Sequence, residues 1–471
     1  MSETLDAIVV GAGSAGLAAV REIGKRTDRF LLVNDGPYGT TCARVGCMPS
    51  KVLIEAANAF HKREIFDTMG IRGGAGLSVD LPAVLARVRA LRDDFVAGTL
   101  KLTDRLGDRS VAGRATILGP GRVEVAGREY RARSIVLATG SSPVVPKPWR
   151  AFGDRILTTD TLFEQQTLPG RIAVVGLGAI GVEIAQALSR LGVQVWGFDA
   201  AERLAGVADP KVEAVLSEAL GGEFRIRTGV AVELAEAAGG IEVKAGDERV
   251  VVDKVLAAVG RRPNLAGLGL ETLGVKLDER GMPPVDPSTL RIGDLPVFLA
   301  GDANGDRALL HEAADEGHIA GLNAVAEEPL CFQRRTPLGV VFCAPNLATV
   351  GLRFDRFDAA TMIVGEADFR RQSRARMTGR DRGLARVYAD RESGRLLGAT
   401  MCVPEGEHMA HLLALAVGQG LTAADLLRMP VYHPVLEEGL RGAFRELAKQ
   451  LPGGGESDLA TCEGFQAEAL D

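Results

Sequence analysis

The same short pattern occurs twice in this chain of 471 residues, and it limits the possible folds more than any other feature. In each copy an apolar run leads into a glycine-rich turn of the form GxGxxG, and an apolar helical pattern follows. The two copies cover residues 7–23 and 171–191. A strand before the turn and a helix after it make this turn a strong sign of dinucleotide binding. We therefore predict an α/β protein with two Rossmann-like domains.

Each glycine of such a turn has its own role. The first makes the tight turn, the second lets a pyrophosphate approach the backbone, and the third lets the helix pack closely on the strand. We expect these roles for the glycines of the two turns, which in chain order are Gly11, Gly13, Gly16, Gly176, Gly178 and Gly181.

An acidic residue about twenty positions after the turn usually binds the ribose hydroxyls. In the second copy this residue is Asp199, and its charge favours NAD(H), because it would repel the 2′-phosphate of NADP(H). In the first copy the position falls on Asn34, with Asp35 beside it. We assign the first ribose contact to this pair.

Two cysteines with four residues between them follow the first Rossmann-like unit. A regular helix would hold Cys42 and Cys47 on different faces, too far apart for a disulfide. If they pair, the backbone between them must be irregular, as Gly46 would allow, and Pro49 suits the first turn of a following helix. The dipole of such a helix would lower the pKa of a thiol at its start. From the spacing alone, two interpretations remain equally open: the cysteines form a redox-active pair, or both are buried and reduced.

After residue 337 the pattern changes to that of an α+β domain. Short apolar runs predict a mainly antiparallel sheet, and two helical patterns accompany it; the predicted strands and helices are 339–342, 348–350, 385–388, 396–401, 408–419 and 423–427. Near its end Glu438 follows His433 after five residues. A carboxylate there could hold the imidazole in one tautomer and raise its basicity.

Composition restricts the class of protein. A net charge of −6 argues against nucleic acid as the main partner, and no apolar stretch is long enough to span a membrane. The first residues lack the basic region of a signal peptide, and six unevenly spaced cysteines do not form a disulfide scaffold. We therefore expect a cytoplasmic protein, in which a disulfide would be catalytic rather than structural. We expect no metal site.

Taken in order, these motifs resemble the pyridine nucleotide–disulfide oxidoreductases of class I, most of all the dihydrolipoyl dehydrogenases. The resemblance covers residues 11 to about 447. Its most specific parts are the two glycine-rich turns and four short stretches, which are residues 42–51 (CARVGCMPSK), 138–140, 300–302 and 433–434.

The resemblance implies two cofactors. It places FAD at the first glycine-rich turn and the ribose pair, together with Lys51, Thr139, Gly140 and Asp302, the last of which ends a predicted buried strand. It places NAD(H) at the second glycine-rich turn, together with Asp199 and Gly260.

The resemblance also implies catalytic roles. Cys42 and Cys47 would form a redox-active disulfide, with Cys42 exchanging with the substrate and Cys47 lying against the flavin. Two further pairs match this family: Lys51 and Glu183 near the reactive nitrogen of the flavin, and His433 and Glu438 as catalytic base and its orienter. The latter pair would act on the other subunit of a homodimer.

The implied activity is oxidation of a protein-bound dihydrolipoyl group, or of a small dithiol, by NAD⁺, and it is reversible. The domains expected are an FAD domain in two parts, an NAD domain, a dimerisation domain and a flexible tail, at residues 1–148 with 265–334, 149–264, 335–450 and 451–471. Three departures from the family, Asn34, Thr40 in place of glycine and Asn346 after Pro345, suggest a divergent member with a lipoyl carrier of its own.

Two other functions remain open at this point. One is an NAD(P)H-dependent reductase of a small disulfide such as glutathione disulfide, against which Asp199 counts. The other is a catalytically silent flavin-binding or scaffold protein, against which the intact cysteine and histidine motifs count. A mercuric reductase would need paired cysteines in the tail, where Cys462 stands alone and is taken as incidental.

Overall fold

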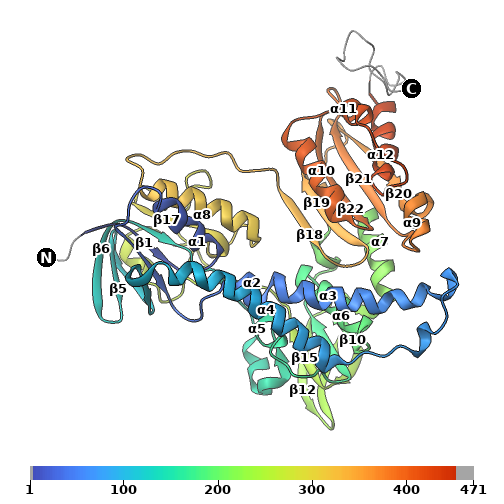
Figure 1. Cartoon of the computed structure of the whole chain (residues 1–471), viewed down its shortest axis with the longest axis horizontal. Coiled ribbons are helices and arrows are strands. Elements are labelled where there is room, and N and C mark those ends of the chain that lie inside the picture. The colour runs from blue at the N-terminus through green and yellow to red at the C-terminus, as the bar shows by residue number, and fades with distance from the viewer. Residues whose placement is uncertain (1–3, 452–471) are drawn as a thin grey trace. The chain divides into compact units, whose positions relative to one another are not determined.

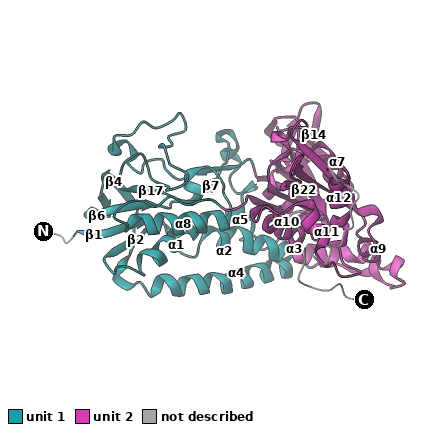
Figure 2. Ribbon diagram, turned by 90° about the horizontal axis from the view of Figure 1, so that it is seen from above, with its two compact units in different colours: residues 1–53, 80–168, 259–334 teal, residues 54–79, 169–258, 335–471 magenta. Residues whose placement is uncertain are grey.

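The structure is a computed structural model that describes residues 4–451, coloured along the chain in Figure 1. Cys462 and all but the first residue of the expected tail lie outside the described residues. The chain forms two compact units, shown in Figure 2. Unit 1 comprises residues up to 53, 80–168 and 259–334, and unit 2 comprises 54–79, 169–258 and 335 onward. The limits of the three domains and the tail expected from the sequence remain a prediction.

Unit 1 is built on a sheet whose parallel strands run in the order β3–β2–β1–β6–β17. Strand β6 also pairs with an antiparallel β5–β4 extension. The strands are β1 (Leu5–Val10), β2 (Phe30–Asn34), β3 (Ser110–Ala112), β4 (Ala115–Gly119), β5 (Arg122–Val125), β6 (Arg128–Leu137) and β17 (Val297–Leu299). Because side chains alternate along each strand, two cores form, one on each face of this sheet.

Two helices cover one face of this sheet. Helices α1 (Ser14–Ile23) and α8 (Leu310–Ala324) pack against each other, and their small residues let the backbones meet closely. A Cβ on Gly317 would lie 2.1 Å from the carbonyl oxygen of Ala15. The first glycine-rich turn is thereby fixed between a strand and a tightly packed helix pair.

The segment that holds Cys42 and Cys47 forms a short helix and the start of a long one. The sequence predicts helices over 52–66 and 81–106. The first of these is found as α3 (Cys47–His61), which begins earlier and is preceded by the short helix α2 (Thr41–Val45), and the second is found as α4 (Leu81–Asp104). Helix α3 begins earlier than predicted because Pro49, within its first turn, needs no hydrogen-bond partner for a backbone N–H. It ends at His61, where short 3₁₀ turns follow.

Unit 2 contains a second parallel sheet and an antiparallel one. The parallel strands run in the order β11–β10–β9–β15, namely β9 (Arg171–Val175), β10 (Gln194–Phe198), β11 (Arg225–Arg227) and β15 (Lys254–Ala257). Helix α6 (Ala179–Arg190) follows the second glycine-rich turn, and α7 (Pro210–Gly221) follows β10. A three-stranded meander joins β11 to β15 through β12 (Val232–Ala237), β13 (Gly240–Ala245) and β14 (Glu248–Val252).

The predicted antiparallel sheet is confirmed in the C-terminal part of unit 2. Its order is β18–β19–β22–β21–β20, with strands Leu338–Val341, Asn346–Gly351, Leu396–Val403, Leu384–Asp390 and Met362–Asp368. Helices α10 (Gly406–Gly418), α11 (Ala423–Arg428) and α12 (Glu438–Lys449) share its core. Strand β20 and helix α12 were not predicted. Within residues 4–451, no helix combines the length and the apolarity needed to cross a membrane.

Candidate active site

A break between two helices brings the two cysteines together. Cys42 lies in α2, the backbone turns at Gly46 (φ −123°, ψ −119°), and Cys47 is the first residue of α3. Both are free thiols, and the thiol of Cys42 is hydrogen-bonded to Cys47. The irregular backbone expected between them is thus present. Two thiols this close are suited to a reversible disulfide.

The two thiols influence each other's charge. The hydrogen bond with Cys47 and partial burial raise the pKa of the Cys42 thiol. The lowering expected from the helix dipole concerns the thiol at the start of α3, which is Cys47, and it stays a prediction. A neighbouring thiol that loses its proton first disfavours a second negative charge.

Thr40 adds strain beside this pair. Its φ of 57° and ψ of 149° belong to a region that favours glycine, at a cost of about 1–3 kcal/mol for other residues. Its hydroxyl accepts a hydrogen bond of 3.2 Å from the backbone N–H of Ala43 and so caps α2. The side chain of Thr40 thus caps α2 in the turn before Cys42.

The glycines of the first turn have the geometry that dinucleotide binding requires. A Cβ on Gly11 would lie 2.2 Å from the carbonyl oxygen of Ala138, and one on Gly16 would lie 1.8 Å from that of Gly11. A Cβ on Gly13 would meet no described atom within 4 Å. The first and third glycines are therefore needed for packing, whereas the space in front of the second is left for a ligand.

The second turn repeats this geometry in unit 2. A Cβ on Gly181 would lie 1.8 Å from the carbonyl oxygen of Gly176, whose φ is 92°. A Cβ on Gly178 would meet no atom of the described residues within 4 Å, as at Gly13. The same three roles therefore recur in the same order.

Asn34 and Asp199 occupy equivalent places after the two turns. The Oδ1 atom of Asn34 accepts a 3.0 Å hydrogen bond from the N–H of Ala12, and Oδ2 of Asp199 accepts one of 2.5 Å from that of Leu177. Each side chain thus ties its strand end to the second residue of its glycine-rich turn. The amide nitrogen of Asn34 also donates to Gly36, so both of its polar atoms contact the backbone.

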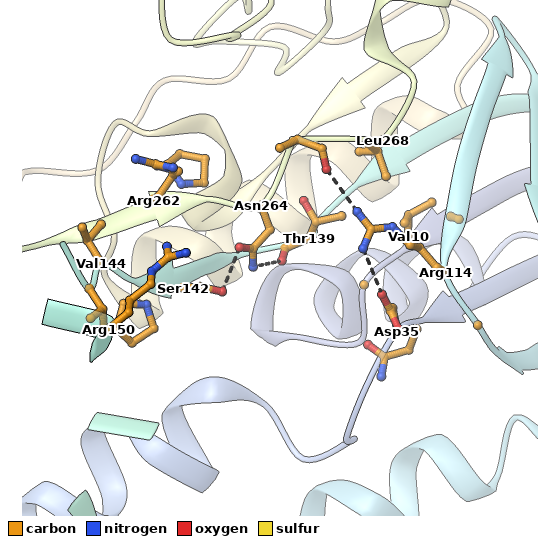
Figure 3. Close-up of a pocket in the computed structure, with 18 residues that line it drawn as sticks. Val10, Asp35, Arg114, Thr139, Ser142, Val144, Arg150, Arg262, Asn264 and Leu268 are labelled. Atoms are coloured by element: carbon orange, nitrogen blue, oxygen red, sulfur yellow. Dashed lines mark hydrogen bonds and ion pairs between the residues drawn. The ribbon is translucent and has the colours of Figure 1, made fainter. Parts of the chain in front are cut away.

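A cavity of about 520 Å³ lies in unit 1 in front of the first turn (Figure 3). Asp35 opens onto it and faces Arg114 at 4.0 Å. On its wall the Oγ1 atom of Thr139 is buried with no hydrogen-bond partner among residues 4–451. This unpaired hydroxyl, the free space at Gly13 and the charges of Asp35 and Arg114 fit a bound dinucleotide.

Several residues of this cavity were missed from the sequence. Asn264 donates to the carbonyl oxygen of Thr139 at 3.0 Å and accepts from the Ser142 hydroxyl at 2.8 Å, and Arg150 and Arg262 also line the cavity. Two of them, Arg262 and Asn264, lie in the GRRPN stretch at residues 260–264, of which only Gly260 was assigned to a ligand from the sequence. Gly260, predicted to contact NAD(H), is in unit 1, and its carbonyl accepts from the N–H of Val144 at 3.0 Å.

Asp302 is held by a chain of hydrogen bonds. It follows β17 in a 3₁₀ turn, and its Oδ2 atom accepts a 2.7 Å hydrogen bond from the Ser141 hydroxyl. Arg261 in turn donates to the Oγ atom of Ser141 at 2.8 Å and to its carbonyl at 2.6 Å. The buried carboxylate of Glu316 accepts from the N–H of Gly301 at 2.6 Å, and burial raises its pKa. Within residues 4–451 the hydrogen bonds to the Asp302 carboxylate involve Oδ2 and not Oδ1.

His433 and Glu438 are brought together in unit 2, as their spacing suggested. The Nδ1 atom of His433 lies 3.0 Å from Oε2 of Glu438, which begins α12. Leu436, between them, is buried in the core and anchors the loop. With Nδ1 bound to the carboxylate, Nε2 of the exposed imidazole is the atom that can take a proton.

The remaining predicted residues have mainly structural contacts. Glu183 is buried in α6, and its Oε1 atom accepts from the N–H of Phe342 at 2.8 Å. Lys51 is in unit 1, so its pairing with Glu183 stays a prediction. Asn346 donates to the carbonyl of Cys343 at 2.8 Å, and burial raises the pKa of the Cys343 thiol to about 12. This thiol is therefore inert at neutral pH.

The chain matches two related family descriptions over most of its length. Residues 5–317 match "Pyridine nucleotide-disulphide oxidoreductase", and residues 338–444 match the dimerisation domain of the same family. A dihydrolipoyl dehydrogenase of Thermus scotoductus is 34% identical over 95% of this chain and 98% of its own length. Dihydrolipoyl dehydrogenase 3 of Pseudomonas aeruginosa is 31% identical over 95% of this chain and 98% of its own length.

Solved structures agree on the fold. LpdA from Mycobacterium tuberculosis has a TM-score of 0.82 with 26% identity, covering 94% of this chain and 99% of its own. The HOCl-induced flavoprotein disulfide reductase RclA from Escherichia coli, as its Cu(II) complex, also has a TM-score of 0.82 and covers the same shares, with 23% identity. The arrangement of sheets and helices described above is thus that of known flavoprotein disulfide reductases.

Proposed function

Because the chain belongs to the pyridine nucleotide–disulfide oxidoreductase family, we propose that it oxidises a protein-bound dihydrolipoyl group with NAD⁺ through Cys42 and Cys47. It is an FAD-dependent disulfide oxidoreductase that uses NAD(H). The observation that carries the proposal is the hydrogen-bonded thiol pair at the break between α2 and α3. A silent scaffold would need neither this pair nor the oriented imidazole of His433.

The first glycine-rich turn and the cavity before it would hold FAD. Gly13 would admit its pyrophosphate, Asp35 and Thr139 would bind its polar groups, and Asp302 would meet it at the end of β17. Bound there, FAD supplies a two-electron carrier between the thiols and NAD⁺. The second turn and Asp199 would hold NAD(H), with the charge of Asp199 selecting against a 2′-phosphate.

The chain's own residues account for the exchange steps. His433 takes a proton from the substrate dithiol, and the resulting thiolate attacks Cys42 of the Cys42–Cys47 disulfide, releasing Cys47 as a thiolate. The second substrate thiol then displaces the Cys42 sulfur from the mixed disulfide and passes its proton to that sulfur. The substrate leaves as a disulfide, having given up two electrons and two protons, and the enzyme holds the Cys42 thiol, the Cys47 thiolate and one proton on His433. Glu438 keeps Nδ1 of His433 protonated, so that Nε2 faces the substrate.

The C-terminal part of unit 2 carries the dimerisation domain of the family. We propose a homodimer in which His433 of one subunit serves Cys42 of the other. The exposure of His433 and its fixed orientation by Glu438 support this arrangement. We also propose the domain limits given above and a cytoplasmic location.

A comparison of two substrate pairs tests the proposal. Initial rates are measured for dihydrolipoamide with NAD⁺ and for glutathione disulfide with NADPH. We expect turnover of the first pair and little of the second, because Asp199 disfavours NADPH. The opposite ranking would assign the chain to the small-disulfide reductases, and inactivity with both pairs would refute the dihydrolipoyl assignment.

Removing the hydroxyl that orients Asp302 should weaken FAD retention. Ser141→Ala deletes the hydrogen bond to Oδ2 of Asp302, and hydrogen bonds to charged groups are worth enough to lower the affinity about tenfold. The affinity is measured by the fluorescence of FAD as it rebinds to the apoprotein. Ser288→Ala, whose hydroxyl donates to Asp286 and does not line the cavity, is the matched control and should change it less than twofold. Equal losses in both variants would contradict a specific role for Ser141.

A further inference from the structure

Thirteen residues of the C-terminal sheet domain carry an unusual concentration of positive charge. Residues 370–382 contain six arginines and one aspartate, a net charge of +5 in a chain whose total is −6. The rest of the chain therefore carries −11. We call residues 370–382 the arginine segment.

The arginine segment is a rigid part of unit 2. It follows β20 as a 3₁₀ turn (Phe369–Arg371) and the short helix α9 (Ser373–Met377), next to β20 in Figure 1. Phe369 and Ala375 are fully buried in the core of the sheet domain. The side chain of Gln372 accepts a 2.7 Å hydrogen bond from the N–H of Ala375 and so caps α9. The backbone that carries the arginines is therefore fixed.

Most of this charge is available to a partner. Arg370 pairs with Asp368 at 2.5 Å and Arg380 with Glu405 at 2.6 Å. The other four arginines, all exposed, have no acidic partner within 4 Å in the described part of the chain; they are Arg371, Arg374, Arg376 and Arg382. Met377 among them is 58% exposed. Exposed arginine and methionine together are typical of protein interfaces.

The arginine segment is joined to the loop that carries the imidazole. The amide nitrogen of Gln372 donates a 2.6 Å hydrogen bond to the carbonyl of Val435, two residues after His433. The ring of Phe369 packs against Gly439 so closely that a Cβ there would lie 2.7 Å from it. A substrate that reaches His433 therefore meets the field of these arginines.

From this juxtaposition we infer that the arginine segment docks an acidic protein that carries the dithiol substrate. The inference rests on the proposed function and names the kind of carrier. A single exposed ion pair contributes little, so an open surface with four unpaired arginines is effective only toward a partner with several carboxylates. The negative charge elsewhere on the chain would repel an acidic partner, so electrostatic steering would direct that partner to the arginine segment. Because the arginine segment is hydrogen-bonded to the loop that carries His433, the favoured partner is the protein that carries the substrate rather than a nucleic acid.

A matched pair of charge reversals tests the inference. Arg374→Glu with Arg376→Glu alters the arginine segment, whereas Arg21→Glu with Arg26→Glu alters two exposed arginines of unit 1 and changes the net charge equally. Three substrates are compared in the intact holoenzyme: neutral dihydrolipoamide, dihydrolipoate with one carboxylate, and a recombinant dihydrolipoyl domain of strongly acidic surface. We expect the first variant alone to raise KM for the acidic domain about tenfold, with kcat and both small substrates nearly unchanged.

The other outcomes are distinguishable. An equal effect on KM for dihydrolipoate would assign the arginines to small anionic substrates and overturn protein docking. Equal effects of the two charge-reversal variants on KM for the acidic domain would also overturn docking at the arginine segment. Tight binding of a 20-nucleotide single strand that the first variant abolishes, with an unchanged KM for the domain, would assign the surface to nucleic acid. Inactivity of the unmodified enzyme with dihydrolipoamide would refute the proposed function itself. Binding of the oxidised lipoyl domain, measured by calorimetry, would still decide the docking question.

Discussion

Cys42→Ser and Cys47→Ser are each expected to lower dihydrolipoamide oxidation by roughly a thousandfold or more, because each removes one partner of the disulfide. Their spectra should differ. In Cys42→Ser the remaining Cys47 thiolate, if it lies against the flavin, gives a long-wavelength absorption band in the oxidised enzyme. In Cys47→Ser that band is absent. Steady-state rates and the absorption spectrum of the FAD-loaded enzyme measure both effects.

The unmodified enzyme should develop the same band only on reduction with NADH. Cys331→Ser, at an exposed cysteine of unit 1, is the control and should keep both activity and band. Absence of the band in the reduced unmodified enzyme would remove the basis for a redox pair. A band in Cys47→Ser rather than in Cys42→Ser would reverse the roles of the two cysteines.

The parts of this fold that depend on local pattern could be predicted from the sequence. The turns at Gly11 and Gly176 were found because their steric demands are local: a side chain at the third glycine would collide with the first. The break at Gly46 was expected only if Cys42 and Cys47 pair, because a regular helix would hold them apart. Such features need no knowledge of the rest of the chain.

Helix α12 carried a local signal that we overlooked. It buries Leu440, Ala443, Phe444 and Leu447, which is the i, i+3, i+4, i+7 pattern of an amphipathic helix. Strand β20 was harder, because it alternates buried and half-buried residues and includes Gly365, which weakens a strand pattern. Tertiary packing requires this glycine, because a Cβ there would lie 2.1 Å from the carbonyl oxygen of Ala443 in α12.

The contacts that orient site residues were not predictable, because they join distant parts of the chain. Ser141 lies 161 positions before Asp302 and 120 before Arg261, and the motif just before it, at residues 138–140, indicates neither contact. The contact of Gln372 with the loop after His433 likewise spans 63 positions. The raised pKa of Cys42 could not be foreseen either, because it depends on a hydrogen bond with Cys47.

His433→Gln is expected to lower kcat/KM for dihydrolipoamide by about 10²–10⁴, because glutamine cannot accept the proton of the substrate thiol. Electron transfer from NADH to the cysteines needs no such base. Mixing the variant with NADH in a stopped-flow instrument should therefore still produce the long-wavelength band at an unchanged rate, whereas mixing it with dihydrolipoamide should not. Comparing the rates of the two half-reactions thus distinguishes loss of the catalytic base from damage to the fold.

Glu438→Gln should have a smaller effect, about tenfold. The glutamine oxygen still accepts from Nδ1 of His433 at the observed 3.0 Å, but without its charge it no longer stabilises the imidazolium that forms when the substrate proton arrives. The loss should appear with dihydrolipoamide and not in the reduction of the enzyme by NADH, because only deprotonation of the substrate uses the imidazole. Glu437→Gln, at the neighbouring carboxylate, should leave both rates unchanged. A Glu438→Gln enzyme with full activity would mean that the carboxylate only holds the loop, and that the base acts without it.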